Sequence, residues 1–408
     1  MAPLPLGLAC VAAATRQAGH EVSWLDLMFA SDAADAVQKA IAEFQPEVIG
    51  ISVRNIDDQK MSAPRFLLDP VKEIVSLCRQ ESKAPVVLGG AGYSMFPEAV
   101  LRYVGADLGI QGDGEAAFPA LLEGLASGER RPHAPGVYLA GTPASPVRFP
   151  LRLDDFPLPA PESWISPSVS KTDVWIPVQS QRGCPMHCSF CSTSVIQGST
   201  RRTRSAQSVV NWLRQLRAAG YRNLAFVDNN FNLPSAHAKE LCRQIAAARL
   251  DLNLWCIVYP KLVDAELVDL MQRAGCQEAS LGFESASEHV LRGFNKRFDA
   301  AEVRAIAGRF AQAGIRRRGF LMLGAPGETR DSVEESLEFA DSLHLDGLNL
   351  TVGIRIYPQT ALCQTAREEG LIGRDDDLLA PRFYLAPGLR DWLPQRAADY
   401  KAARAWVQ

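Results

Sequence analysis

Short apolar segments alternate with amphipathic helical segments in two separate runs along this chain of 408 residues. The first run occupies residues 1–140 and the second occupies residues 172–365. Strands separated by helices pair in parallel, and parallel sheets are buried on both faces, which fits strand segments rich in Val and Ile. We therefore expect an α/β protein whose N-terminal domain is a doubly wound, Rossmann-like parallel sheet. Its expected strands are residues 21–27, 47–53, 84–90 and 108–112.

The second run repeats a strand and a helix six times at a nearly constant period. This repeat predicts a partial (β/α)6 barrel, a fold in which functional residues lie at the carboxyl ends of the strands. A proline-rich stretch, residues 141–171, separates the two runs and is expected to be a linker. Residues 366–408 are expected to form a short C-terminal segment. The expected barrel strands are residues 174–180, 223–229, 252–258, 278–285, 317–325 and 347–358.

Charge and hydropathy argue against several classes of function. The chain has 43 basic and 46 acidic side chains and a net charge of -3, which argues against nucleic-acid binding and against a polybasic membrane anchor. No stretch reaches the roughly 18 uninterrupted apolar residues of a membrane-spanning helix, and we expect a cytoplasmic protein. In that reducing compartment, six isolated cysteines are expected to be small buried apolar residues. They are Cys10, Cys78, Cys242, Cys256, Cys276 and Cys363.

Three further cysteines, Cys184, Cys188 and Cys191, are packed into the segment RGCPMHCSFCSTS directly after the first barrel strand. Thiolates bind zinc or iron-sulfur clusters. A structural zinc site commonly has two CxxC pairs, and no second pair exists here; a redox CxxC pair would leave Cys184 without a role. A disulfide is disfavoured in the cytoplasm. Three cysteines spaced CxxxCxxC can hold three irons of a 4Fe-4S cluster and leave the fourth iron open.

The segment CPMHCSFC resembles the cluster motif of radical S-adenosylmethionine (radical SAM) enzymes, with Phe190 in the aromatic position before the last cysteine. The resemblance extends over about residues 172–365. It implies that Cys184, Cys188 and Cys191 hold a 4Fe-4S cluster whose fourth iron binds the amino and carboxylate groups of S-adenosylmethionine. It also implies reductive cleavage of S-adenosylmethionine to a 5′-deoxyadenosyl radical that abstracts hydrogen.

Three strand ends further along the chain match positions at which radical SAM enzymes bind S-adenosylmethionine. FVDNNF lies where the methionine amino group is held, although the family's glycine-rich form is missing. LGFESAS carries the positions used near the ribose and carboxylate, and GFLMLGAPGET resembles the glycine motif that approaches the adenine. The alternatives are an Asx turn, a buried glutamate with a structural partner, and glycines needed by a tight turn. The implied residues are Asp228, Asn229, Asn230, Glu284, Ser285, Gly324 and Gly327.

The N-terminal domain resembles the cobalamin (B12)-binding domain that precedes many radical SAM cores. The matching segments include IGISVRNIDD, VVLGGAGYSMFPEAVL and GIQGDGEAAFPALL, in this order. Three glycines just past a parallel strand lie where open sheets bind ligands. They leave room for the nucleotide tail of cobalamin, and a serine on the neighbouring strand offers a hydroxyl; helix packing alone would explain one of the glycines. The residues are Ser52, Gly89, Gly90 and Gly92.

The chain departs from the classical cobalamin carriers in one motif. It has no DxHxxG segment, so no histidine is placed to ligate cobalt from below. The loop that carries this histidine follows the first strand of the sheet, and this chain opens on a helix, residues 6–19, instead. Arg54 and Asn55 are our candidates for covering the lower face of cobalamin, although a surface ion pair is the commoner role of an arginine.

Together the two resemblances predict a class B-like radical SAM methyltransferase that methylates an unactivated carbon of a small molecule or peptide through methylcobalamin. One alternative is a rearrangement, ring contraction or cyclisation with the same cofactors; another is a non-catalytic cobalamin or iron-sulfur sensor. The expected electron donor is a low-potential protein such as flavodoxin or ferredoxin. Candidates for substrate specificity near the strand ends are Tyr259, Arg318, Arg355 and Tyr357.

Overall fold

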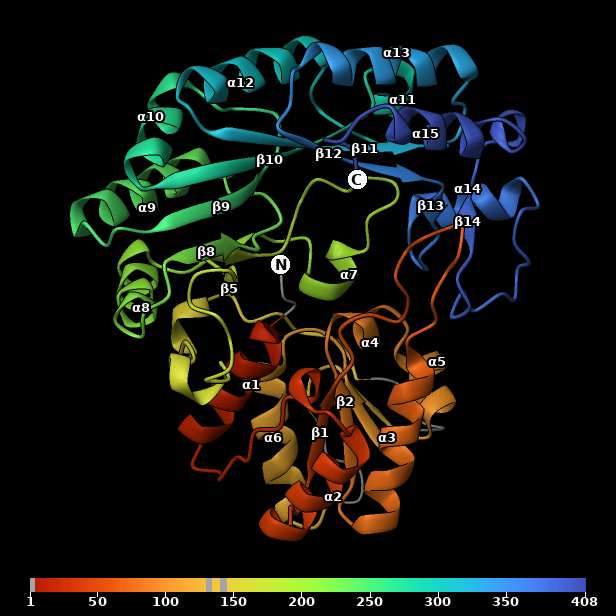
Figure 1. The fold of residues 1–408 in the computed structure, drawn as a ribbon. Helices are drawn as coiled ribbons and strands as arrows, with labels where there is room; N and C mark the ends of the chain where they lie inside the picture. Colours follow the sequence, from red (N-terminus) through yellow and green to blue (C-terminus); the bar gives the residue numbers. More distant parts are fainter. Residues whose placement is uncertain (1–3, 130–133, 140–144) are drawn as a thin grey trace.

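The structure is a computed structural model that describes residues 4–129, 134–139 and 145–408. It contains an N-terminal α/β unit, coloured red to orange in Figure 1, and a larger green-to-blue unit stacked on it. The short helix α7 (Thr193–Gln197) lies between the two units. Both predicted α/β runs are therefore present as separate sheets that share one interface.

The N-terminal sheet has the strand order β1-β2-β3-β4. Strands β1 (Ile49–Ser52), β2 (Val86–Gly89) and β3 (Leu108–Ile110) are parallel, and β4 (Val137–Leu139) runs antiparallel to β3. The three parallel strands and the helices around them confirm the predicted doubly wound fold. The helices are α1 (Leu6–Gln17), α2 (Ala33–Phe44), α3 (Leu68–Glu81), α4 (Ala91–Met95), α5 (Pro97–Val104) and α6 (Gly114–Ala126).

The strand predicted at residues 21–27 is wrong. Residues 21–26 have no regular secondary structure and lead into a 3-10 helix, η1 (Leu27–Phe29), where the Asp26 carboxylate accepts a hydrogen bond of 3.0 Å from the backbone N–H of Met28. Apolar alternation produces a strand only where a neighbouring strand pairs its backbone groups. Within the described residues the sheet ends at β1, so this segment has no pairing partner.

The larger unit contains a six-stranded parallel sheet with the order β12-β11-β10-β9-β8-β5. Its two end strands do not pair with each other, which confirms the predicted partial barrel. The strands are β5 (Ile176–Val178), β8 (Asn223–Phe226), β9 (Asn253–Val258), β10 (Cys276–Glu284), β11 (Arg316–Leu323) and β12 (Gly347–Val352). The helices between them are α8 (Ala206–Ala218), α9 (Ser235–Ala248), α10 (Ala265–Arg273), α11 (Glu288–Gly293), α12 (Ala300–Gln312) and α13 (Arg330–Ser342).

Several short elements lie outside this repeat, in separate two-stranded sheets and in the C-terminal part of the chain. The hairpin of β6 (Gln181–Arg182) and β7 (Arg202–Thr203) flanks the three clustered cysteines. Beyond β12, the C-terminal part packs on the barrel, and Leu348 of β12 bridges to Val407. Its elements are β13 (Ile354–Arg355), α14 (Ala361–Glu368), β14 (Phe383–Tyr384) and α15 (Leu393–Ala402).

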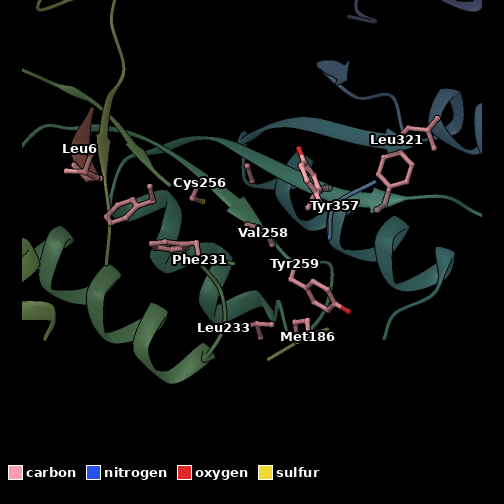
Figure 2. Packing of buried hydrophobic residues seen from close by; sticks show 14 of the residues in the cluster. Leu6, Met186, Phe231, Leu233, Cys256, Val258, Tyr259, Leu321 and Tyr357 are labelled. Atoms are coloured by element: carbon pink, nitrogen blue, oxygen red, sulfur yellow. The ribbon is translucent and has the colours of Figure 1, made fainter. Parts of the chain in front are cut away.

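One continuous cluster of buried apolar side chains extends through both units, and a smaller one lies between α6 and the β2–β4 part of the N-terminal sheet. Figure 2 shows part of the large cluster, including Met186 from the cysteine segment and Tyr259 and Tyr357 from the ends of barrel strands. The two units therefore share a core, and burial of apolar surface holds them together.

The proline-rich stretch between the units is packed along its described part. Leu153 and Trp164 are 2% and 1% exposed. Arg204 Nη1 donates a hydrogen bond of 2.7 Å to the carbonyl of Leu153, and Trp212 Nε1 donates one of 2.8 Å to the carbonyl of Pro159. From residue 145 onward the predicted linker is packed against the larger unit, in part along α8. We call residues 145–171 the strap.

We predict that Trp164→Ala lowers the free energy of unfolding by about 3–5 kcal/mol, because it leaves a large cavity in the shared core. Leu151→Ala is the control, since Leu151 lies in the same stretch and is 75% exposed. Urea unfolding of both variants measures the difference. Equal unfolding midpoints for the two variants would show that the strap does not contribute to the core.

Candidate functional site

The three clustered cysteines lie in the loop between β6 and α7, residues 183–192, here called the cysteine loop. The backbone N–H of Cys184 bonds to the carbonyl of Gly198 at 3.1 Å, and that of Cys191 bonds to the carbonyl of Cys188 at 3.1 Å. Gly183 has a φ of +80°, and a Cβ added there would lie 2.1 Å from the carbonyl oxygen of Thr200. Glycine is therefore required where the loop begins.

The three thiols are free, partly exposed and close enough to affect one another. The pKa of Cys188 is raised, chiefly by burial and further by Cys191 and Cys184, while the ammonium of Lys296 lowers it. Asn230 Nδ2 donates to Cys184 Sγ at 3.3 Å, and Cys191 Sγ donates to Thr193 Oγ1 at 3.2 Å. The loop thus presents three soft ligands at one edge of the barrel.

Three free thiols in one loop are a donor set that suits an iron-sulfur cluster. Among the residues that the structure describes, no three His, Cys, Asp or Glu side chains converge on one ion. A tetrahedral zinc site would bring its sulfurs within about 4 Å of one another. The cysteines of a 4Fe-4S cluster bind different irons and need no common centre.

Phe190 anchors the cysteine loop to the end of α11. Its ring packs edge-on against Phe294 at 5.0 Å between centroids, and the backbone N–H of Ser189 donates to the carbonyl of Phe294 at 3.2 Å. Asn295 Nδ2 donates to the carbonyl of His187 at 3.0 Å. The aromatic position of the motif therefore fixes the loop against the barrel.

Asp228, Asn229 and Asn230 follow β8, and they bond to the cysteine loop or to the segments directly before and after it. The buried carboxylate of Asp228 accepts hydrogen bonds from the backbone N–H groups of Ser180 and Gln181 at 2.8 and 3.0 Å and from the Ser180 hydroxyl at 2.5 Å. Burial raises the pKa of Asp228 to about 6 although these hydrogen bonds lower it. Asn229 and Asn230, rather than Asp228, keep polar atoms beside the cysteines.

Asn229 joins α7 to the end of β8. Its Nδ2 donates to Gln197 Oε1 at 2.7 Å, and its Oδ1 accepts a long contact of 3.5 Å from Thr193 Oγ1. Together with the contact of Asn230 to Cys184, these bonds bring the FVDNNF segment and the cysteine loop into one site.

Glu284 ends β10 and pairs with a lysine that sequence reasoning missed. Lys296 Nζ lies 3.1 Å from Glu284 Oε1, and their side chains are 6% and 12% exposed. The ammonium also lies 5.3 Å from the ring centroid of Phe190 and 5.9 Å from those of Tyr259 and Phe298. Burial lowers the pKa of Lys296, but the attraction of Glu284 and neighbouring groups outweighs it, so the pKa is raised overall. The sequence signal for this buried lysine was its position between two phenylalanines in the segment FNKRF.

The side chain of Ser285, next to Glu284, packs against helix α13. It is fully buried, and its hydroxyl lies 3.0 Å from the hydroxyl of Ser336 on α13. Its Oγ also accepts a hydrogen bond of 3.1 Å from the backbone N–H of Ser287. Ser285 therefore holds the strand end in place from behind the sheet.

Gly324 and Gly327 lie in the loop after β11. Their φ angles are +104° and +72°, and a Cβ on Gly324 would lie 2.4 Å from Leu385 Cδ1, so the turn itself requires glycine there. Glu328 closes the turn by accepting hydrogen bonds from the backbone N–H groups of Gly324 and Ala325. Burial raises the pKa of Glu328 to about 7.

The carboxyl ends of β1 and β2 bring together residues 52–55 with Gly89, Gly90 and Gly92. Because the sequence predicts cobalamin binding at these residues, we call them the cobalamin cradle. A Cβ on Gly90 would lie 2.6 Å from the carbonyl oxygen of Val53, and one on Gly92 would lie 3.0 Å from it. Packing on the loop after β1 thus requires these two glycines. Gly89 differs, because a Cβ there would have no atom within 4 Å and would point into open space.

The two sites meet at the interface between the units. Helix α4, which begins directly after Gly90, packs against α7, which begins two residues after Cys191. Figure 1 shows α7 facing α4 below the barrel sheet. The cysteine loop and the cobalamin cradle are therefore held at one junction.

Two protein families match the chain. The radical SAM superfamily matches residues 178–340, and the B12 binding domain matches residues 3–122. These matches span more than half of the chain, and they coincide with the two sites described above. The chain belongs to the cobalamin-binding radical SAM family.

Relatives of known activity or structure cover nearly the whole of this radical SAM chain. Tryptophan 2-C-methyltransferase of Streptomyces laurentii is 26% identical over 90% of this chain and 72% of its own. The methyltransferase TsrM of Kitasatospora setae, solved with tryptophan and a SAM analogue, has a TM-score of 0.89 at 23% identity and covers 99% of this chain and 88% of its own. TsrM solved with cobalamin and a [4Fe-4S] cluster has a TM-score of 0.87 at 22% identity, with the same coverage.

These matches confirm the predicted family and fold class, and they confirm the predicted cofactor set of a 4Fe-4S cluster, S-adenosylmethionine and cobalamin. The structures, at below 25% identity, establish the fold. Within the described residues, no helix of this radical SAM protein has the length and apolar character needed to span a membrane.

Two arginines proposed for substrate specificity have structural roles instead. Arg355 is buried and bonds to Asp57 of the N-terminal unit at 2.8 Å and to the carbonyls of Ile356 and Leu378 at 2.7 and 2.8 Å. Arg318 bonds to Glu278 at 2.9 Å near the amino end of β11, away from the carboxyl end that carries the site. The sequence showed that both arginines lie in predicted strands. It did not show that Glu278 and Asp57 pair with them.

Tyr259 and Tyr357 remain candidates for lining the substrate site, and a further arginine joins them. Tyr259 Oη accepts a hydrogen bond of 2.9 Å from the backbone N–H of Arg297. Arg201 is half-buried near Cys184, and its Nη2 is shielded from solvent with no hydrogen-bond partner among the described residues. The segment RRTRS gave no signal to separate this arginine from its neighbours.

We predict that Glu328→Gln reduces the pH dependence of stability. Because burial raises the pKa of Glu328 from 4.5 to about 7 in the folded protein, stability is full below pH 4.5 and falls as pH rises through 7. The loss amounts to about 3 kcal/mol. Glutamine keeps an acceptor for the turn and has no proton to lose. The unfolding free energy of Glu328→Gln will therefore fall less than that of the wild type between pH 5 and pH 8.

Glu338→Gln on the exposed face of α13 is the matched control and should reproduce the wild-type pH profile. Urea unfolding at several pH values measures all three proteins. An unchanged slope in Glu328→Gln would contradict the account of the turn.

Proposed function

We propose that this protein is a cobalamin-dependent radical SAM methyltransferase that transfers a methyl group to a carbon of a small molecule. The observation that carries the proposal is the junction of α7 with α4, which holds the cysteine loop against the cobalamin cradle. Named relatives of this chain include a tryptophan 2-C-methyltransferase and a hopanoid C-3 methylase. They support methyl transfer over rearrangement or sensing.

When bound, the cluster supplies the electron that cleaves S-adenosylmethionine, and cobalamin supplies a nucleophilic cobalt for methyl transfer. Cys184, Cys188 and Cys191 are the residues that would hold the cluster. Phe190 and Asn295 keep their loop rigid through Phe294 and the carbonyl of His187. Rigid support matters because a small displacement of reacting groups reduces the rate strongly.

The polar groups around the cysteine loop would hold S-adenosylmethionine. Glu284 offers its carboxylate to ribose hydroxyls, and Lys296 fixes that carboxylate by an ion pair within an aromatic surround. Asn229 and Asn230 offer amide oxygens to an ammonium group, whereas Asp228 acts indirectly by holding Ser180 and Gln181. The turn at Gly324 and Gly327 would face the adenine.

The cobalamin cradle would hold the corrinoid against the backbone of its glycines. Gly89 borders open space, so atoms of a ligand can approach the strand end directly. Ser52 offers a hydroxyl from β1. Arg54 and Asn55 are exposed on the loop after β1 and would cover the lower face of cobalamin. Arg54 is free to do so, because its side chain makes no hydrogen bond or ion pair within the described residues.

For the substrate, we propose a small molecule that carries an anionic group. The shielded Nη2 of Arg201 near Cys184 is a donor that such a group would satisfy. A substrate similar to tryptophan, which a relative methylates, has a carboxylate of this kind. A flavodoxin- or ferredoxin-like protein stays our prediction for the electron donor.

The direct test is anaerobic incubation of the reconstituted protein with cobalamin, a low-potential reductant, small-molecule substrates beginning with tryptophan, and S-adenosylmethionine labelled with ¹³C in its methyl group. Mass spectrometry should find the label in a methylated product, together with S-adenosylhomocysteine. 5′-Deoxyadenosine without methyl transfer would favour rearrangement, and neither reaction with both cofactors bound would favour a sensor.

We predict that Cys188→Ala abolishes the cluster's visible absorbance and all cleavage of S-adenosylmethionine to 5′-deoxyadenosine, because one iron loses its ligand. Cys242→Ala is the matched control, since Cys242 is a buried cysteine on α9. This control should retain the cluster. Equal cluster content in the two variants would contradict the assignment of Cys188.

We predict that Gly89→Val weakens cobalamin binding at least about tenfold, because methyl groups would occupy the space that the ligand needs. Its unfolding midpoint should stay close to that of the wild type, since a Cβ there meets no protein atom. Gly90→Ala should instead lower the unfolding midpoint, because its φ is +97° and its Cβ would contact the carbonyl of Val53. Equilibrium dialysis and thermal unfolding distinguish the two; wild-type cobalamin affinity in Gly89→Val would exclude this cradle.

A further inference from the structure

A buried network of ion pairs joins the N-terminal unit to the cysteine loop. Arg182 on β6 lies 2.6 Å from Glu115 and 3.4 Å from Asp113, and Arg202 on β7 also pairs with Asp113. The four side chains are between 1% and 10% exposed. Two guanidinium groups and two carboxylates balance, so the network is neutral as a whole, which is the condition for burying charge.

One end of this network is fixed to the cysteine loop. Arg182 is separated from Cys184 by Gly183 alone, and its Nε donates to Gln179 Oε1 at 2.8 Å. The pairing of β6 with β7 closes the base of the loop, with Arg182 opposite Arg202. A displacement of Arg182 would therefore displace the first cluster cysteine.

The other end is fixed to the cobalamin cradle. Asp113 and Glu115 begin α6, directly after Gly112. The backbone N–H of Gly112 donates to Ser94 Oγ at 3.0 Å, and Gln111 Nε2 donates to the carbonyl of Ser94 at 2.9 Å. Ser94 lies on α4, the helix that also contains the cradle residue Gly92. Hydrogen bonds and ion pairs, together with the chain itself, thus connect the cradle, α4, the start of α6, Arg182 and the cysteine loop.

We propose that Arg182 is a positioning residue that couples the two cofactor sites, so that the cluster and cobalamin each raise the protein's affinity for the other. The inference rests on the proposed function for its cofactor set and adds the coupling between them. Cluster assembly orders the cysteine loop and with it Arg182, which then holds Glu115 and α4 in the arrangement that binds cobalamin. By thermodynamic linkage, cobalamin must stabilise the cluster to the same extent.

The test needs a variant that breaks the coupling and keeps the fold. Removal of Arg182 alone would leave Glu115 as an uncompensated buried charge and would destabilise the protein for that reason alone. The double variant Arg182→Met/Glu115→Leu removes both charges and replaces their volume, a change that buried ion pairs tolerate. Asp113 and Arg202 remain as a balanced pair.

Arg396→Met/Glu334→Leu is the matched control. These two residues form an ion pair between α15 and α13, with both donor-acceptor distances at 2.6 Å, and neither touches the junction of the two units. The control makes the same chemical change within the barrel.

The measurement is the dissociation constant of hydroxocobalamin, by equilibrium dialysis, for each protein with and without its reconstituted cluster. We expect the cluster to tighten cobalamin binding at least about fivefold in the wild type and in the control. In Arg182→Met/Glu115→Leu the ratio of the two constants should be close to one. Cluster stability, followed by its EPR signal with and without cobalamin, should show the same coupling.

Equal cobalamin affinity with and without the cluster in the wild type would overturn the inference and leave the proposed function intact. Retention of the wild-type ratio in Arg182→Met/Glu115→Leu would overturn the role of Arg182. Absence of cobalamin binding in every form of the wild type would overturn the proposed function, and the inference with it.

Discussion

Parallel strands place their loops at one edge of a sheet, and in this chain two such edges face each other. The contact between α4 and α7 sets the distance between the cobalamin cradle and the cysteine loop. In the proposed methyl transfer both cofactors act on S-adenosylmethionine or the substrate, so the reaction depends on the relative position that this contact gives them. The shared apolar core and the strap packed on α8 keep the units in place.

Several buried polar groups hold the segments of the two units in position. The carboxylate of Asp228 accepts three hydrogen bonds from Ser180 and Gln181, and Arg355 joins Asp57 across the units. Each of these groups would be costly to bury without its partner. A buried donor without a hydrogen-bond partner in the described residues, such as Nη2 of Arg201, is therefore a group that a ligand would satisfy.

The fold was predictable because strand and helix patterns are local, and the cofactors were predictable because short motifs resemble those of known families. Strand-helix alternation defines the sheets, and the CxxxCxxC spacing places three thiols in one loop. The strand expected at residues 21–27 failed because pairing depends on a neighbour that local pattern does not reveal. The pair of Arg182 with Glu115 joins residues 67 positions apart, which meet only in the folded chain. The pair of Lys296 with Glu284 spans 12 positions, but it depends on how α11 folds back on the end of β10.

The most direct test of the account is EPR spectroscopy of the protein that carries both cofactors, with cobalamin as paramagnetic cob(II)alamin. Reduction of the cluster should broaden and split the cobalt signal, because the two spins lie at one junction and interact. Two independent spectra that add without change would show that the cofactors are far apart, and would contradict a common site formed by α4 and α7.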